Sequence, residues 1–193
     1  HLEQSDAKSY MTHQVNRWQE ATGHKDVVMC LSSYPTFRHQ LSPEYKANRP
    51  AKDELSLEQM RRTVEALRDD GFVLVEIDGF EADDIIGTLV KRAETQGFES
   101  FMVTPDKDFA QLLSPHTFMW KPGRRGNDHD VITLEQLPEI WGVEEPDHII
   151  DLLGLMGDAS DNIPGIPGIG PKTAQKLIAA YGSIENLLAD TSK

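Results

Sequence analysis

Short apolar runs alternate with segments of helical periodicity, and this alternation restricts the possible folds more than any other feature of the sequence. Three runs have the length of a buried strand, namely Val27–Leu31, Phe72–Ile77 and Phe101–Thr104. Before and between them, apolar residues recur at helical spacing over residues 7–21, 57–67 and 85–93. Such a pattern favours a parallel sheet covered by helices on both faces. The sequence therefore predicts an α/β domain.

The pattern changes after about residue 133, where we expect no further strands. Thr133 and Gln136 have the spacing of a capping box and open a predicted helix that reaches Trp141. Further helices are expected over residues 147–156, 173–180 and 184–189. Residues 32–56 are polar and contain three prolines, which predicts a loop. We predict an α/β domain over residues 1–132 and a small helical module over residues 133–193.

Charge is distributed unevenly along the 193 residues. The chain holds 19 basic and 32 acidic side chains, a net charge of −13 that by itself argues against a nucleic-acid partner. Residues 1–70 are nearly balanced, with 10 basic and 11 acidic side chains, whereas residues 71–193 hold 9 and 21. The single cysteine, Cys30, excludes a disulfide framework and is expected in the core. Without a secretory signal or a membrane-spanning run, we expect an intracellular protein with no membrane partner.

The acidic residues of the second part gather in three groups at predicted element boundaries. The groups are Glu81, Asp83 and Asp84; Asp106 and Asp108; and Asp158 and Asp161. Each group alone could cap a helix or a turn. The first two groups follow strands, and in a parallel sheet they would share the edge where ligands bind. So many like charges repel one another unless cations neutralise them, and carboxylate oxygens suit Mg²⁺ or Mn²⁺. Two such ions can promote phosphodiester hydrolysis.

A turn rich in glycine and proline leads into the helix predicted over residues 173–180. It differs from a phosphate-binding P-loop, because Pro171 separates Gly170 from Lys172 and no strand precedes it. The turn instead offers backbone N–H groups at a helix N-terminus, with lysines nearby, and could bind a phosphate without reading sequence. The alternative is a plain connection between two helices.

A group of basic side chains lies within the predicted loop, in residues 38–56. Its members are Arg38, Lys46, Arg49 and Lys52, with Tyr45 among them. Most such runs are solvated surface. Here they precede the acidic groups, where a phosphodiester strand would need a clamp.

Taken together, these motifs resemble the 5′-nuclease family, which includes the nuclease domain of bacterial DNA polymerase I, phage 5′-exonucleases and flap endonucleases. The resemblance rests on Gly79–Gly87, Thr104–Asp108, Gly157–Gly165, Gly165–Ala174, Thr36–Arg38 and Tyr45–Pro50, and it extends over about residues 27–190. It implies a PIN-like α/β/α nuclease domain with a parallel-type sheet, followed by a helix–three-turn–helix module of the helix-hairpin-helix type. It also implies a two-metal mechanism using Mg²⁺ or Mn²⁺.

The resemblance assigns roles residue by residue. Glu81, Asp83, Asp84 and Asp106 would hold the ions nearest the chemistry, with Asp83 and Asp106 catalytic; Asp108, Asp158 and Asp161 would complete the second site. Lys46 and Arg49 would contact the scissile phosphate, and Tyr45 and Arg38 would guide the 5′ strand. Gly168, Gly170, Lys172 and Thr173 would contact the duplex backbone, with K⁺ at the hairpin.

The same resemblance implies the partners and the setting of the protein. The expected partners are branched or 5′-flap DNA and RNA–DNA primer junctions, and a DNA polymerase could be fused or associated. We expect a monomer in the cytoplasm of a bacterial or phage-infected cell.

The sequence departs from the family pattern in two places. The family places an aspartate at the end of a first strand, but this chain opens with a predicted helix, and its true N-terminus is expected to be missing. A second aspartate is expected near Leu31–Ser33, where the chain has no carboxylate. Two other functions therefore stay open. One is a catalytically weakened DNA-binding fragment or homologue of the family, and the other is an acidic cation-binding protein without a nucleic-acid role.

Overall fold

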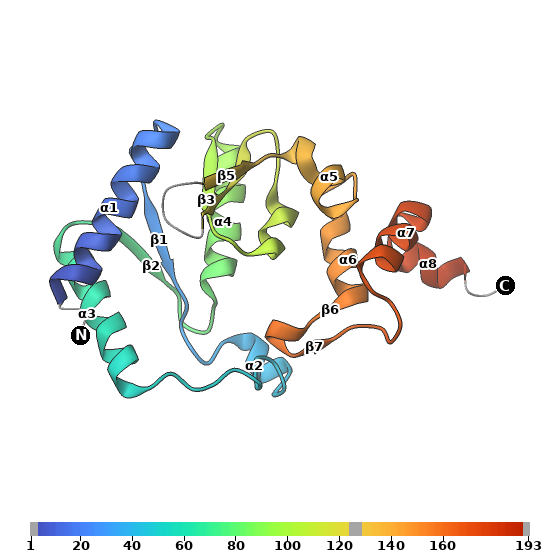
Figure 1. Ribbon diagram of the computed structural model, residues 1–193, viewed down its shortest axis with the longest axis horizontal. Coiled ribbons are helices and arrows are strands. Elements are labelled where there is room, and N and C mark those ends of the chain that lie inside the picture. The colour runs from blue at the N-terminus through green and yellow to red at the C-terminus, as the bar shows by residue number, and fades with distance from the viewer. Residues whose placement is uncertain (1–3, 124–128, 191–193) are drawn as a thin grey trace. The chain divides into compact units, whose positions relative to one another are not determined.

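Figure 1 presents the computed structural model, which describes residues 4–123 and 129–190. By proximity of its residues the chain divides into two units. Unit 1 consists of His1–Phe37 and Arg49–Ile85, and unit 2 consists of Arg38–Asn48 and Ile86–Lys193. The predicted domain boundary between residues 132 and 133 stays a prediction. The two predicted domains together cover residues 1–193, and residues 1–3, 124–128 and 191–193 lie outside the described residues. Among the described residues, no helix is both long and apolar enough to cross a membrane.

Unit 1 is built on two parallel strands, β1 (Val28–Leu31) and β2 (Val73–Glu76), with Val28 opposite Val73. Helices α1 (Gln4–Thr22) and α3 (Glu54–Asp69) pack on each other, and Val15 of α1 and Leu67 of α3 are buried. Asp53 caps α3 by accepting a 2.7 Å hydrogen bond from Ser56 N. These elements confirm the helices and strands predicted for this part of the chain.

Unit 2 contains a three-stranded sheet of β3 (Ser100–Val103), β4 (Thr117–Pro122) and β5 (His129–Ile132). Strand β3 runs parallel to β4, and β5 runs antiparallel to it. Helix α4 (Ala82–Thr95) precedes β3, and the 3₁₀ helix η1 (Lys107–Leu112) follows it. The short helix α2 (Phe37–Leu41) begins at the last residue of unit 1.

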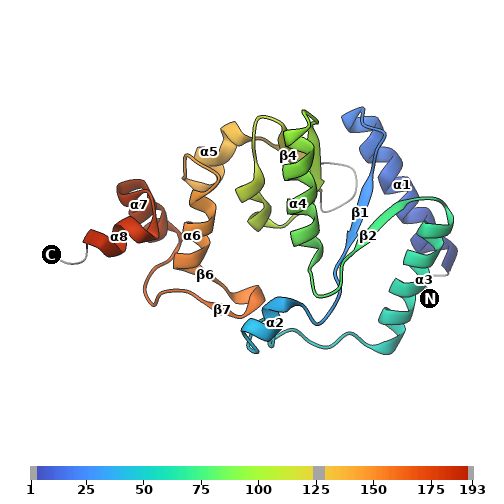
Figure 2. The same cartoon turned by 180° about the vertical axis from the view of Figure 1, so that it is seen from behind.

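The remaining elements of unit 2 form the helical part. They are η2 (Leu134–Gln136), α5 (Leu137–Trp141), α6 (His148–Met156), β6 (Gly157–Asp158), η3 (Ala159–Asp161), β7 (Ile163–Pro164), α7 (Pro171–Tyr181) and α8 (Ile184–Asp190). The predicted capping interaction is present, because the Gln136 side chain accepts a 2.9 Å hydrogen bond from Thr133 N. Helices α6 and α7 lie side by side in both views (Figures 1 and 2).

Three local predictions were wrong, and two strands were missed. Strands β4 and β5 were not predicted; β5 has only two partly or fully buried residues, so its apolar pattern is weak. Strands β6 and β7 occur after residue 133, but each has two residues, too few to show a periodicity. Helix α2 occupies part of the expected loop. Cys30 is only partly buried, because β1 pairs on one side alone within its two-stranded sheet.

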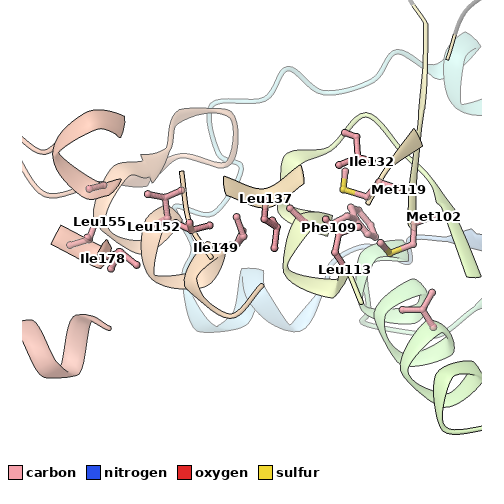
Figure 3. Packing of buried hydrophobic residues seen from close by; sticks show 14 residues of the cluster. Met102, Phe109, Leu113, Met119, Ile132, Leu137, Ile149, Leu152, Leu155 and Ile178 are labelled. Atoms are coloured by element: carbon pink, nitrogen blue, oxygen red, sulfur yellow. The ribbon is translucent and has the colours of Figure 1, made fainter. Parts of the chain in front are cut away.

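One hydrophobic cluster extends through unit 2 (Figure 3). On the sheet side it contains Met102, Phe109 and Met119, and on the helical side Ile149 and Ile178. Leu137 of α5 is fully buried between these two groups in the labelled view. The sheet and the helices α6 and α7 therefore share a core, and this fixes the loops that leave β3 and α6 against a common support.

Candidate functional site

The acidic residues of unit 1 lie at the start of α4. Asp84 accepts a 3.1 Å hydrogen bond through Oδ2 from Glu81 N, and Ser32 Oγ accepts one of 2.9 Å from Ala82 N. These bonds satisfy N–H groups that a helix start leaves without a helical partner. Asp83 is exposed in the first turn, whereas the Glu81 side chain is buried. The capping role considered for this group is therefore present at Asp84.

The segment Leu31–Tyr34, which carries no carboxylate, lies against the residues that lead into α4. Ser33 N donates a 3.0 Å hydrogen bond to Phe80 O, and Ser33 Oγ donates one of 3.4 Å to Asp78. Asp78 thus places a carboxylate beside the position where the family pattern has an aspartate. It was not among the predicted site residues. Its position directly after a strand, before a glycine, was the available signal.

In unit 2, Asp106 and Asp108 follow β3. Asp106 caps η1, because its Oδ1 accepts a 3.1 Å hydrogen bond from Asp108 N, and Asp106 N donates to Thr104 Oγ1. The Oδ1 atom of Asp108 is buried and accepts no hydrogen bond. Lys107 Nζ lies 3.4 Å from that oxygen, as an ion pair without hydrogen-bond geometry. Burial and the neighbouring Asp106 charge raise the pKa of Asp108.

Lys107 connects this turn to the loop after α6, because its ammonium also donates a hydrogen bond to Asp158 Oδ2. Partial burial alone would raise the pKa of Asp158, but hydrogen bonds from Lys107 and Ser160 lower it to about 2. Burial would lower the pKa of Lys107, yet the hydrogen bond to Asp158 and the charge of Asp108 raise it. Sequence reasoning did not select Lys107, although it lies between two selected aspartates.

The loop that carries Asp158 and Asp161 is held at its base by two glycines. Gly157 has a φ of +72°, and a Cβ atom there would collide with the backbone at Gly165. A Cβ atom on Gly165 would collide with Met156 O. This close approach allows β6 and β7 to pair, with Asp158 opposite Ile163. The two-residue ladder therefore fixes where the acidic loop leaves α6.

Two of the predicted clamp residues contact this acidic loop. Tyr45 Oη donates a 3.1 Å hydrogen bond to Asp161 Oδ2, and Lys46 Nζ lies 3.7 Å from the same oxygen. Tyr45 is buried, and the Lys46 side chain is 10% exposed. Arg38 lies partly buried in α2, and Arg49 is exposed and belongs to unit 1. Asn48 and Asn162, which sequence reasoning missed, also join these segments.

The predicted nucleic-acid turn precedes α7. Gly168 has a φ of +84°, and Gly170 stands at the N-cap position with Pro171 as the first helical residue. Gly170 O accepts hydrogen bonds from Thr173 N and Ala174 N. Four predicted contact residues are exposed here, namely Gly168, Gly170, Lys172 and Thr173. A phosphate could reach this helix start, which carries a positive dipole end.

Over residues 4–123 and 129–190, no group of three or more His, Cys, Asp or Glu side chains is arranged as a metal-ligand set. The donor chemistry in unit 2 nevertheless suits a hard divalent cation. Asp106, Asp108 and Asp158 offer oxygen only, and a buried carboxylate oxygen without a hydrogen bond is an atom that a cation would satisfy. In its place, Lys107 supplies the positive charge between Asp108 and Asp158.

Comparison with known structures identifies the fold. The fold matches that of a bacteriophage T5 flap endonuclease, solved as a pseudo-enzyme–product complex with DNA and metal ions, at a TM-score of 0.77 and 22% identity. The match covers 94% of this chain and 70% of the phage chain. The chain therefore has the PIN-like nuclease fold followed by a helical module.

Sequence comparison then names the family. The profile described as 5′-3′ exonuclease, N-terminal resolvase-like domain, matches residues 3–142, and the one described as 5′-3′ exonuclease, C-terminal SAM fold, matches residues 144–193. The chain belongs to the 5′-3′ exonuclease family.

Two curated relatives show how much of a longer protein the chain represents. It is 46% identical over 154 residues to DNA polymerase I of Bacillus caldotenax, covering 80% of this chain and 17% of the polymerase. It is 38% identical over 169 residues to a 5′-3′ exonuclease of Buchnera aphidicola, covering 88% of this chain and 57% of the exonuclease. The chain thus spans less than two thirds of either relative.

Proposed function

We propose that this chain hydrolyses phosphodiester bonds at 5′ flaps or 5′ ends of DNA, or of RNA primers on DNA, with Mg²⁺ or Mn²⁺. The observation that carries the proposal is the carboxylate group of unit 2, in which Asp108 keeps a buried oxygen without a hydrogen bond while Lys107 supplies a positive charge beside it. Because the chain belongs to the 5′-3′ exonuclease family, we infer that these carboxylates serve a nuclease.

We assign the cations to the seven predicted carboxylates, and this assignment is part of the proposal. They are Glu81, Asp83, Asp84 and Asp106, nearest the chemistry, and Asp108, Asp158 and Asp161. When bound, divalent ions supply an activated water and stabilise the leaving oxygen. The residues of the chain orient and bind: Lys46 and Arg49 would contact the scissile phosphate, and Tyr45 and Arg38 would guide the 5′ strand.

The helical part would bind the duplex backbone. The exposed residues at the start of α7, among them Gly170 and Lys172, would contact phosphates irrespective of base sequence, and a K⁺ ion could be shared between the turn and a phosphate. Such contacts predict affinity that falls steeply with salt. The polymerase relative suggests that a polymerase follows or accompanies the nuclease.

Cleavage of a 5′-end-labelled flap duplex by this chain tests the proposal. We expect a short labelled product with Mg²⁺ and with Mn²⁺, and none with EDTA. Absence of product under all three conditions, from a folded chain, would contradict the proposal.

A second candidate is a catalytically weakened DNA-binding member of the family. It is favoured by the segment Leu31–Tyr34, which has no carboxylate and whose Ser33 side chain contacts Asp78 instead. Loss of a metal ligand lowers both metal affinity and rate. Under this alternative the flap duplex binds at low salt but is not cleaved, and Ser33→Asp restores cleavage. Unchanged inactivity of Ser33→Asp would argue against that explanation.

A further inference from the structure

Besides the hydrogen bond from Tyr45 Oη to Asp161 Oδ2, three more connect residues 44–48, here called the clamp segment, to residues 158–162, the acidic loop. All three use a main-chain atom on at least one side, and both segments belong to unit 2. They run from Lys46 N to Asp161 O (2.9 Å), from Asn48 Nδ2 to Ala159 O (2.8 Å) and from Asn162 Nδ2 to Glu44 O (2.7 Å). The two asparagines therefore fasten the segments reciprocally, one from each side.

The backbone of both segments is shaped for this connection. Among the described residues, Lys46 (φ 56°) and Asn162 (φ 58°) are the non-glycine residues with positive φ. Such a conformation is uncommon and persists where the surrounding structure holds it. Here each of the two residues also supplies one donor of the connection. The strained positions and the hydrogen bonds thus coincide.

The connection sets where the Lys46 side chain lies. Its ammonium is 4.8 Å from the centre of the Tyr45 ring and 3.7 Å from Asp161 Oδ2. A lysine side chain has many rotamers, and a single ion pair rarely restrains it by more than about 1 kcal/mol. The hydrogen bond from Lys46 N to Asp161 O fixes where this side chain leaves the main chain, and its burial beside Tyr45 and Asp161 restricts the rotamers it can adopt. The position of the ammonium relative to the acidic loop therefore depends on the main-chain connection together with the contacts to Tyr45 and Asp161.

We propose that Asn48 and Asn162 are positioning residues that hold Lys46 in register with the acidic loop, so that the ammonium and a cation that Asp158 and Asp161 would hold act on the same phosphate as one preformed unit. The inference rests on the proposed function, because it assigns Lys46 to the phosphate and the aspartates to a cation. Its physical basis is preorganisation: groups held in place before binding need no ordering in the transition state.

The test compares the double variant Asn48→Ala/Asn162→Gly with the single variant Asn48→Ala. Glycine at position 162 accommodates the left-handed backbone, so the change removes the amide without adding strain. Asn186→Ala is a matched control, because Asn186 Nδ2 also donates to a main-chain oxygen, Tyr181 O, at 2.9 Å. We expect kcat on the flap duplex to fall 10- to 100-fold in the double variant, with KM changed less than threefold. The control should stay within twofold of the wild type.

A double-mutant cycle separates positioning from a general loss of structure. In the wild-type background Lys46→Ala should lower kcat strongly, whereas in the Asn48→Ala/Asn162→Gly background it should have less than a threefold effect, because the ammonium is already misplaced. Additive effects, or a wild-type kcat in the double variant, would overturn the inference and leave the proposed function intact. Melting temperatures of all variants establish that the comparison is made on folded protein.

Binding in Ca²⁺ without cleavage provides a readout that does not need activity. If the wild type fails to cleave with Mg²⁺ or Mn²⁺, the proposed function fails. The inference is then decided by affinity for a 5′-phosphorylated flap duplex: Lys46→Ala should weaken binding about tenfold in the wild type and not in the double variant. Equal weakening in both backgrounds, or no binding by the wild type, overturns the inference.

Discussion

The acidic residues of the two units are stabilised by different partners. In unit 1, Asp84 accepts a hydrogen bond from a helix-start N–H, so its charge is offset by the positive end of α4. In unit 2, Asp108 and Asp158 instead share the ammonium of Lys107, and one Asp108 oxygen remains without a hydrogen bond. Capped carboxylates are satisfied by the fold itself. In unit 2, Asp106 and Asp158 also accept main-chain hydrogen bonds, but the buried Asp108 oxygen accepts none, and this difference indicates where metal binding would change the protein most.

Removing a carboxylate that the proposal places next to the chemistry should have the largest effect. We expect Asp106→Ala and Asp83→Ala each to lower the rate of flap cleavage by at least about 10³-fold, because metal ligation and the charge balance of the site are lost. DNA affinity should be kept or increased, since repulsion of phosphate decreases. Measurement requires single-turnover cleavage and binding in Ca²⁺.

The control for these variants is Glu144→Ala, which removes an exposed acidic side chain of unit 2 outside the three groups. It should cleave at the wild-type rate. Normal cleavage by Asp106→Ala or Asp83→Ala would contradict the metal assignment for that residue.

The stability of the acidic loop should depend more on the two glycines that hold its ends together, Gly157 and Gly165, than on any of its charged side chains. In Gly165→Ala the new methyl group meets the main chain at Met156, so the β6–β7 ladder must open. We expect the free energy of unfolding to fall by about 3 kcal/mol, as for overpacked sites. Gly170→Ala is the control, because its φ of −98° is ordinary and nothing lies within 4 Å. Urea unfolding that gives similar losses for both would refute the close-approach argument.

The pH dependence of stability should report the Lys107–Asp158 pair. The pKa of Asp158 is about 2 in the folded chain and 3.8 ordinarily, so the unfolded state binds the proton first. The hydrogen bonds that Asp158 accepts from Lys107 and Ser160 therefore stabilise the fold fully above pH 4, and the contribution is lost as the pH falls from about 4 to 2. It amounts to at most about 2.5 kcal/mol, at about 1.4 kcal/mol per unit of pKa, and to less where solvent screens the partly exposed pair.

Asp158→Asn, which cannot ionise, provides the comparison. Urea unfolding at several pH values should show that the advantage of the wild type over Asp158→Asn shrinks as the pH falls below 4. If the difference in free energy of unfolding between the wild type and Asp158→Asn stays constant between pH 5 and pH 2, the hydrogen bonds to Asp158 do not lower its pKa.

Substitution of Lys107 should make the difference between the carboxylates of the two units larger. In Lys107→Met the Asp108 and Asp158 carboxylates lose their shared cation, and a divalent ion no longer has to displace an ammonium. We expect affinity for Mn²⁺, measured by electron paramagnetic resonance titration, to rise about tenfold, or 1.4 kcal/mol. Lys172→Met, an exposed lysine at the start of α7, should leave it unchanged. Equal or weaker Mn²⁺ binding by Lys107→Met would show that the Lys107 ammonium does not compete with the ion for these carboxylates.

The sequence predicts the local parts of this arrangement well and the distant ones poorly. Apolar periodicity places most helices and strands, and the acidic groups do lie at element boundaries, because these features depend on residues close in sequence. The family resemblance adds the fold. Lys107 meets Asp158 across 51 positions and Asn162 meets Glu44 across 118, and neither contact leaves a periodic or spacing signal. Strand β5 is missed for a related reason, since its pairing partner β4 rather than its own pattern makes it a strand.

The smallest effect is expected for the capped carboxylate of unit 1. Asp84→Asn keeps an oxygen that can accept the hydrogen bond from Glu81 N and removes only the charge. The free energy of unfolding should therefore change by less than about 0.5 kcal/mol, the size of a weak helix-dipole contribution. Asp84→Ala, which removes the acceptor as well, should cost about 1 kcal/mol. Urea unfolding of both variants measures the difference.

The same pair of variants distinguishes capping from metal binding at Asp84. If Asp84 also holds a cation, as proposed, Asp84→Asn should weaken Mn²⁺ binding although its stability is nearly that of the wild type, because an amide is a poorer ligand for a hard divalent ion than a carboxylate. A protein with both stability and Mn²⁺ affinity unchanged would assign Asp84 to capping alone. The proposed metal ligands would then be the other carboxylates of the predicted set. At Asp84 the fold alone would satisfy the carboxylate, in contrast to Asp108 of unit 2.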